Sequence, residues 1–276
     1  MIYTRFWRCR SICSISLPVY TEQSIPTQIP FKKPRTSQPV PVPPTSENAL
    51  VDPEALEREL SPAARKMRML KTLVCGNRYE RAARAGGARV VAGVDEVGRG
   101  ALFGPVVAAA VILPEGCRIP GLRDSKQLIR EERERLARIV ERRALAIAIE
   151  EVDAETIDRI NIYQATRVAM TAAVCRLALA PDHLLVDAMR LDFACAQTSI
   201  IYGDSLSVSI AAASVLAKVY RDDRMRQLDR DYPVYGLASH KGYSTPEHKQ
   251  ALLAHGPSPL HRRSFRPVAE NCLPWD

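Results

Sequence analysis

The sequence predicts an α/β fold, in which a mixed sheet is flanked by helices and followed by a helical C-terminal part. Residues 89–94 and 105–113 are apolar, β-rich segments on either side of a glycine-rich turn, which favours an antiparallel hairpin. Strand-like segments then alternate with amphipathic ones, as in a sheet with helices packed on it. A length of 276 residues with 46% hydrophobic content is enough for one large domain and a tail.

The elements before and after the hairpin follow from apolar spacing. Apolar residues at helical spacing predict one or two lead-in helices over 53–85, before Gly86-Gly87. Residues 130–144 form an amphipathic stretch typical of a helix, and 145–152 are strand-like. Asp153 is expected to cap one helix that continues through Leu179.

The second half of the domain repeats this alternation and then becomes helical. Short strands are predicted over 183–187 and 198–202. Residues 207–232 predict a long helix, apolar at first and charged later. Thr245-Pro246-Glu247 opens a last helix that should end at Gly256.

These elements give a four-part organisation. We expect a disordered, proline-rich basic tail over 1–50, a helical lead-in over 51–88, the main α/β domain over 89–268 and a short C-terminal tail over 269–276. Eight of the twenty prolines lie in residues 1–48, where they oppose helices and sheet ladders. The first 21 residues contain Arg and Ser but no acid, as a transit peptide does. Three simpler explanations of this segment are favoured: a misassigned start codon, a dispensable tail or a weak nucleic-acid tether.

Composition excludes several classes. The sequence contains no run of 18 apolar residues, the length needed to span a bilayer, so we expect a cytoplasmic protein without membrane partners. The seven scattered cysteines include no CxxC pair, so we expect reduced thiols. The net charge is +8, but residues 1–48 hold half of this excess. The rest of the chain is only mildly basic, so a nucleic-acid function must be argued from a site.

Carboxylates end several core elements. Asp95-Glu96 follows one apolar strand and Asp187 another, and strand ends are where open α/β sheets place ligands. Asp222 lies on the long helix four residues after Lys218, which also permits a salt bridge. Singly, each acid is more typical of a turn, cap or solvated face. Together they predict a site for Mg²⁺ or Mn²⁺, because clustered carboxylates repel unless cations lie between them.

Such a site supports hydrolysis of a phosphodiester. Two ions about 3.5–4 Å apart can stabilise the attacking and leaving oxygens of an in-line displacement. The absence of nearby histidines in the sequence argues against zinc. The acids therefore predict a nuclease or a phosphoryl-transfer enzyme.

Several ordered motifs resemble ribonuclease HII. Residues 94–100 (VDEVGRG) and 104–108 (GPVVA) resemble the opening of that family, and further matches follow in its order: Asp124-Ser125-Lys126, Leu185-Val186-Asp187, residues 209–222, His240-Lys241-Gly242-Tyr243 and residues 256–265. The resemblance covers about 89–268. Arg99 between the two glycines favours ribonuclease HII over HIII, which usually has lysine there. Residues 101–103 depart from it, since proline more often follows the second glycine.

The resemblance implies an RNase H-like fold and a four-acid site of Asp95, Glu96, Asp187 and Asp222 that binds Mn²⁺ or Mg²⁺. It also implies that Gly98-Arg99-Gly100 holds a ribonucleotide through its 2′-OH, and that Tyr243 stacks on the following sugar. Glycine permits this close approach, and the 2′-OH distinguishes RNA from DNA. A plain tight turn and an ordinary loop tyrosine are the simpler alternatives.

The remaining substrate candidates are basic or polar. Phosphate contacts are expected of Lys126, Lys218, Lys241, Arg262 and Arg263, each of which could instead be a solvated charge, with Ser125 as a neighbouring polar group. The expected partners are RNA/DNA hybrids and ribonucleotide-containing duplex DNA, bound by a monomer. The rivals are another RNase H-like nuclease or integrase, which would cut DNA without a 2′-OH, and a catalytically inactive nucleic-acid-binding module.

Overall fold

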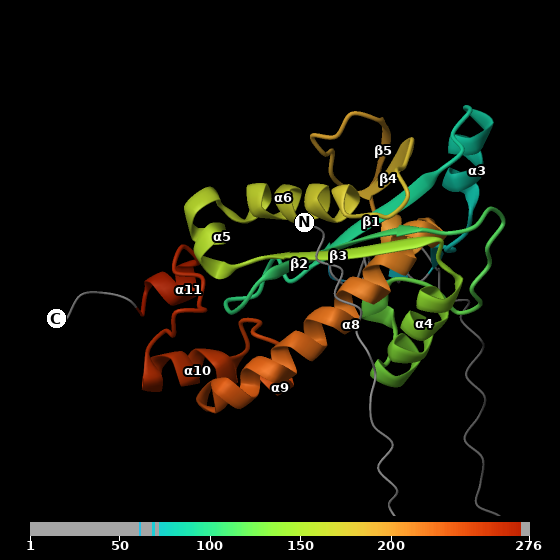
Figure 1. The fold of residues 1–276 in the computed structure, drawn as a ribbon. Helices are drawn as coiled ribbons and strands as arrows, with labels where there is room; N and C mark the ends of the chain where they lie inside the picture. Colours follow the sequence, from blue (N-terminus) through green and yellow to red (C-terminus); the bar gives the residue numbers. More distant parts are fainter. Residues whose placement is uncertain (1–60, 62–67, 70–71, 272–276) are drawn as a thin grey trace, which may run out of the picture. The chain divides into compact units, whose positions relative to one another are not determined.

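The computed structural model describes residues 61, 68–69 and 72–271, which all lie in one compact unit, Asp52–Asp276. A single sheet has the order β3-β2-β1-β4-β5 (Figure 1). Its strands are β1 Val91–Val97, β2 Val106–Ile112, β3 Ala146–Val152, β4 His183–Asp187 and β5 Ala196–Ile200. The first three pair antiparallel, whereas β4 and β5 add in parallel, so the predicted hairpin and mixed sheet are confirmed.

Helices cover both faces of this sheet (Figure 1). One face packs against α6 (Ile162–Cys175), and the other against α4 (Arg130–Arg143) and α8 (Val208–Asp231). Every residue of β2 is buried, because its side chains alternate between two covered faces. Gly93 lets α8 approach β1 closely, since a Cβ atom there would lie 2.1 Å from the Ser209 carbonyl carbon. The long helix is thereby held against the strand that carries Asp95.

Two predicted elements differ from the structure. The single helix expected from Asp153 through Leu179 is divided into α5 (Ala154–Ile160) and α6, because Asn161 has a φ of 66°. The Asn161 side chain accepts a hydrogen bond from Gln164 N–H and begins the second helix. The strand predicted over 198–202 is β5, which ends at Ile200 because Tyr202 turns, with φ 59°, into α7 (Gly203–Leu206).

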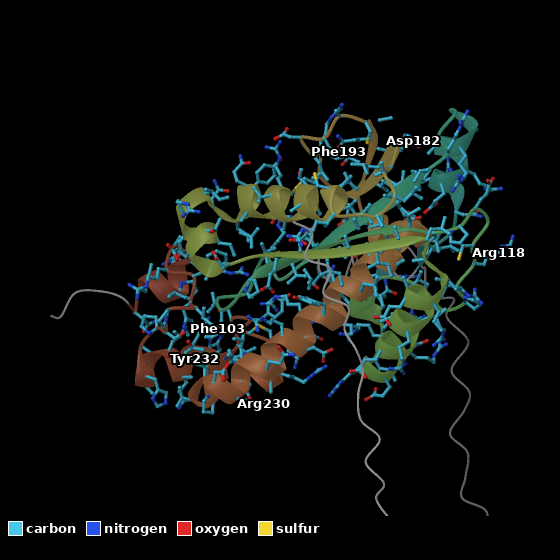
Figure 2. The ribbon with its side chains drawn as sticks, viewed as in Figure 1. Phe103, Arg118, Asp182, Phe193, Arg230 and Tyr232 are labelled. Atoms are coloured by element: carbon cyan, nitrogen blue, oxygen red, sulfur yellow. The ribbon has the colours of Figure 1, made fainter. Side chains whose placement is uncertain are left out.

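The predicted helical C-terminal part consists of short elements: η2 Pro233–Tyr235, α9 Leu237–His240, α10 Pro246–His255 and α11 Arg266–Ala269. Phe103, from the loop between β1 and β2, is fully buried among them. Its ring centroid lies 5.6 Å from that of Tyr232, and Figure 2 shows the two side by side. This packing joins the C-terminal part to the loop that follows Asp95-Glu96.

The lead-in is described only in part. Helix α3 (Arg78–Ala85) lies within the predicted helical range, and a short 3-10 turn, η1 (Ser125–Gln127), precedes α4. The predicted tail over 1–50, most of 51–71 and residues 272–276 lie outside the described residues. Cys75, Cys117, Cys175 and Cys195 are free thiols, as expected.

Candidate active site

The strand register makes Asp95 and Asp187 neighbours. In the parallel pair β1-β4, Val94 lies opposite Val186, so the next residue of each strand is an aspartate on the same face. The sequence predicted that Asp95-Glu96 follows the end of its strand. In the structure both residues lie within β1, which continues along β2 to Val97. Within the described sheet, β4 ends at Asp187, which leaves the last residues of β1 unpaired on that side.

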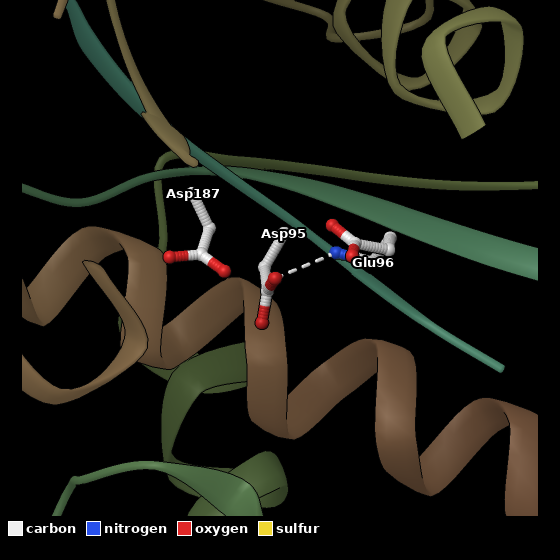
Figure 3. A group of neighbouring side chains, drawn as sticks. All are labelled: Asp95, Glu96 and Asp187. Carbon is white, nitrogen blue, oxygen red and sulfur yellow. Dashed lines mark hydrogen bonds between the residues drawn. The ribbon is translucent and has the colours of Figure 1, made fainter. Parts of the chain in front are cut away.

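Three carboxylates converge at this point (Figure 3). Asp95, Glu96 and Asp187 each offer an oxygen, and these atoms lie within 4.8 Å of one another. The backbone N–H of Glu96 donates to Asp95 Oδ1 at 2.8 Å, and that of Gly203 donates to Asp187 Oδ1 at 2.7 Å. In the described part of the chain, no other such group of potential metal ligands is found.

Burial and mutual repulsion disfavour negative charge on these acids. Burial raises the pKa of Asp95 well above its usual range, and the charges of Glu96, Asp187 and Asp204 add to the effect. Burial likewise raises the pKa values of Glu96 and Asp187, although Arg99 opposes the shift at Glu96 and the Gly203 N–H at Asp187. A cation would relieve the repulsion, so these oxygen donors fit Mg²⁺ or Mn²⁺.

Asp204 is an acid that sequence reasoning missed. It lies on α7, is 5% exposed, and has its pKa raised to about 6, first by burial and then by the charge of Asp124, with Asp187 contributing further. Lys126 Nζ lies 3.3 Å from Asp204 Oδ2. Asp204 follows β5 much as Asp187 ends β4, and this repeated position was the available signal.

Asp222, predicted as the fourth acid, is not brought together with the other three. Its Oδ1 lies 2.6 Å from Lys218 Nζ, and its Oδ2 lies 3.0 Å from Arg133 Nη1. The i,i+4 spacing on α8 thus produces the salt bridge that the sequence also permitted. Asp222 is therefore a buried acid held by two basic side chains, Lys218 and Arg133.

The loop predicted to hold a ribonucleotide lies beside the acids. A cavity of about 210 Å³ is lined by Glu96, Val97, Gly98, Arg99, Gly100, Ser125, Lys126, Ser214, Lys218 and Tyr243. Arg99 is exposed, and its Nη1 lies 3.4 Å from Glu96 Oε1. Tyr243 meets this loop through an antiparallel bridge to Ala101. The structure therefore brings the loop, Tyr243 and two of the predicted lysines around one opening.

The other predicted contacts differ in where they lie. Ser125 lines the cavity, but it is buried and its Oγ lies 3.0 Å from Ser214 Oγ. Lys241 Nζ donates to the carbonyls of Ala238 and Ser239. Arg263 is exposed, outside the residues that line the cavity.

The phosphate contact predicted for Arg262 is wrong, because the side chain does not reach the surface. It is fully buried and donates to the backbone carbonyls of Gly104 and Arg99, at 2.9 Å each. The sequence could not distinguish a basic residue that points to solvent from one that supports the loop from within.

Comparisons with known proteins identify the family of the chain. The family model for ribonuclease HII matches residues 92–268. The chain is 57% identical over 211 residues to ribonuclease HII of Koribacter versatilis, covering 76% of this chain and 83% of that protein. It is 51% identical over 213 residues to that of Bacillus subtilis, covering 77% and 84%.

A solved structure shares the fold. The crystal structure of ribonuclease H2 from Pyrococcus horikoshii aligns with a TM-score of 0.57 and 25% identity, over 66% of this chain and 96% of that one. The mixed sheet flanked by helices is therefore an RNase H-like fold, as expected.

Within the described part of the chain, no helix has the length and apolar character needed to cross a membrane. The chain belongs to the ribonuclease HII family, whose members are endonucleases that depend on a divalent metal and act on RNA/DNA hybrids.

Proposed function

We propose that this enzyme cleaves the RNA strand of RNA/DNA hybrids and also nicks duplex DNA on the 5′ side of a single embedded ribonucleotide. The products would be a 3′-OH and a 5′-phosphate. The observation that carries the proposal is the position of the carboxylate cluster beside a cavity lined by Gly98, Arg99, Gly100 and Tyr243. A backbone turn of this kind suits a 2′-OH, the group that distinguishes one ribonucleotide from DNA.

The acids would hold divalent metal. Asp95, Glu96 and Asp187 would contribute most directly, and Asp204 rather than Asp222 would complete the set, since Asp222 is bonded to Lys218 and Arg133. When bound, two Mn²⁺ or Mg²⁺ ions would stabilise the charge on the attacking and leaving oxygens. The backbone N–H groups of Glu96 and Gly203 fix the orientation of two of these carboxylates.

Basic side chains around the cavity would position the phosphates. Lys126 is exposed, and although burial acts to lower its pKa, the charges of Asp124 and Asp204 raise the value above its usual range. Lys218, which also lines the cavity, forms a salt bridge with Asp222, and its Nζ lies 6.0 Å from the Tyr243 ring centroid. Both positions suit contacts to phosphates next to the cleaved bond.

A duplex with one ribonucleotide tests the proposal. Purified protein with Mn²⁺ should nick this substrate once and should leave the all-DNA duplex of the same sequence intact. Extension of the nick by a DNA polymerase would identify the 3′-OH. Nicking of the all-DNA duplex without cleavage of the ribonucleotide-containing one would contradict the proposal.

Asp187→Asn provides the matched catalytic test. Loss of one carboxylate should abolish cleavage while the affinity for the duplex, measured by fluorescence anisotropy in Ca²⁺, changes little. Full activity in this variant would remove Asp187 from the metal site.

The biological role follows from the substrate. We propose that the enzyme removes ribonucleotides misincorporated into DNA, and that it works in the cytoplasm as a monomer. Light scattering of the purified chain tests the oligomeric state, and a tagged full-length chain tests the location. Ribonucleotides accumulating in genomic DNA after deletion of the gene would support the role.

A further inference from the structure

We infer that Arg221 is a specificity-determining positioning residue, which holds the Gly98–Gly100 loop and the Tyr243 loop in one fixed arrangement. The inference rests on the proposed function, because it assigns ribonucleotide recognition to those two loops. Arg221 lies on α8, next in sequence to Asp222, but its side chain is fully buried.

The guanidinium of Arg221 donates to two separate loops. Its Nε donates to the Pro105 carbonyl at 3.1 Å and its Nη2 to the Phe103 carbonyl at 3.1 Å, both between β1 and β2. Its Nη1 donates to the Lys241 carbonyl at 3.0 Å, two residues before Tyr243. A planar group with donors in fixed directions can join the two segments only in one relative position.

Direct packing strengthens this connection. The Arg221 guanidinium carbon lies 5.5 Å from the Tyr243 ring centroid, within the range of a cation–π contact. On the other side, a Cβ atom at position 98 would lie 2.2 Å from Arg221 Nε. Gly98 also has a φ of 91°, so both its conformation and this contact require glycine. Arg221 therefore contacts both proposed recognition elements.

The charge of Arg221 is held by backbone carbonyls. In the described part of the chain, no salt bridge within 4.0 Å is found for Arg221, and burial lowers the pKa of its guanidinium. A buried cation held in this way is costly, so its position is expected to serve more than packing. Arg262 also supports this loop, by donating to the Gly104 and Arg99 carbonyls, and its Nη2 is buried without a hydrogen-bond partner among the described residues.

Arg221→Lys tests the inference, because lysine keeps the charge but loses the fork of donors. On a duplex with one ribonucleotide, we expect kcat/KM to fall at least about tenfold, mainly through KM. The Mn²⁺ concentration that gives half-maximal activity should change less than twofold, since Arg221 touches none of the clustered acids. The matched control is Arg224→Lys on the same helix, whose side chain is 42% exposed and which should retain wild-type kinetics.

A double-mutant cycle separates positioning from general stability. If Arg221 acts through Tyr243, the two substitutions should not add. The kcat/KM of the variant that combines Arg221→Lys with Tyr243→Ala should be no more than about threefold below that of the less active single variant. Losses that multiply, an unchanged KM, or a shifted Mn²⁺ midpoint would each overturn the inference.

Two further measurements keep the test decisive. If Arg221→Lys does not fold, Gly98→Ala probes the same contact from the loop, and wild-type nicking by that variant would overturn the inference. Failure of the wild-type protein to nick the ribonucleotide duplex would refute the proposed function itself. Equal nicking by wild type and Arg221→Lys would refute only the role of Arg221.

Discussion

At the scale of single residues, Asp204 and Asp222 differ in their partners. Burial raises the pKa of Asp204, with Asp124 and Asp187 contributing, and the charge of Asp204 in turn adds to the raised pKa of Asp95. Asp222 instead forms salt bridges with Lys218 and Arg133. Asp204 has one basic partner, Lys126, which is exposed and shared with Asp124, so a metal ion would still relieve repulsion there. Asp222 already has two basic partners and would gain less. Metal binding should therefore depend on Asp204 much more than on Asp222.

Replacement of each acid by asparagine tests this difference. Asp204→Asn should raise the Mn²⁺ concentration for half-maximal activity by at least about tenfold. Asp222→Asn should leave that midpoint within about twofold but lower the free energy of unfolding by about 1–3 kcal/mol, because two cations lose their partner. Mn²⁺ titrations of activity and urea unfolding provide the measurements. The opposite pattern, a metal midpoint that shifts only in Asp222→Asn, would restore Asp222 to the metal site.

At the scale of elements, the sequence predicts periodic segments better than it predicts contacts between them. The hairpin and the long helix over 207–232 were found because apolar periodicity is local. The break at Asn161 was missed, because a single residue at φ 66° leaves the helical pattern on both sides intact. Asp187 could be selected as a strand end, but its pairing with Asp95 depends on the β1-β4 register, which joins segments about ninety residues apart.

The C-terminal helices contain a further element that the sequence did not reveal. His248 Nε2 lies 3.2 Å from His261 Nε2, and His248 Nδ1 lies 3.0 Å from the Tyr243 carbonyl. The Ser258 N–H donates to His261 Nδ1, so His261 must donate through Nε2. Both imidazoles are neutral in this arrangement, because a second proton on either would place two donors face to face.

This pair predicts loss of stability in mild acid. Burial lowers the pKa of His261 to about 3, with a further contribution from His248, whose own pKa burial also lowers. The unfolded chain takes up protons near pH 6.5, whereas the folded chain does not, so the loss begins as the pH falls through 6.5 and is complete only near 3. The acids of the metal site, whose pKa values are raised, act in the opposite direction but are present in wild type and His261→Gln alike. We therefore expect the free energy of unfolding of wild type, relative to that of His261→Gln, to fall by about 1–2 kcal/mol between pH 7.5 and 5.

Urea unfolding at both pH values measures this effect. His261→Gln should reduce the dependence on pH, whereas His255→Gln, which replaces an exposed histidine at the end of α10, should leave it unchanged. An equal pH dependence in wild type and His261→Gln would exclude the pair as its source.

At the scale of the whole molecule, the active site should oppose folding when metal is absent. Asp95, Glu96 and Asp187 are packed together on the sheet, and burial with mutual repulsion raises the pKa of each. At neutral pH the folded protein must hold this charge, whereas the unfolded chain disperses it in water. The fold provides the compensating stability through its two covered sheet faces.

Asp95→Asn should therefore stabilise the metal-free protein, although most buried substitutions destabilise. Asparagine keeps the shape and can still accept the hydrogen bond from Glu96 N–H, but removes one charge. In EDTA at pH 7.5, we expect the free energy of unfolding to rise by about 1–2 kcal/mol. Asp223→Asn, an exposed acid on α8 paired with Arg226, is the control and should stay within about 0.5 kcal/mol of wild type.

Metal should reverse the order of stability. Mn²⁺ at a hundred times its Kd should add about 2.7 kcal/mol to the wild-type protein, because it binds only the folded state. Asp95→Asn should gain much less, so the wild type becomes the more stable of the two. Thermal unfolding of the three proteins with EDTA and with Mn²⁺ measures both effects. If Asp95→Asn is less stable than wild type in EDTA, Asp95 stabilises the fold. If the variant is more stable than wild type in EDTA but less stable in Mn²⁺, Asp95 is kept for metal binding at a cost to the stability of the fold.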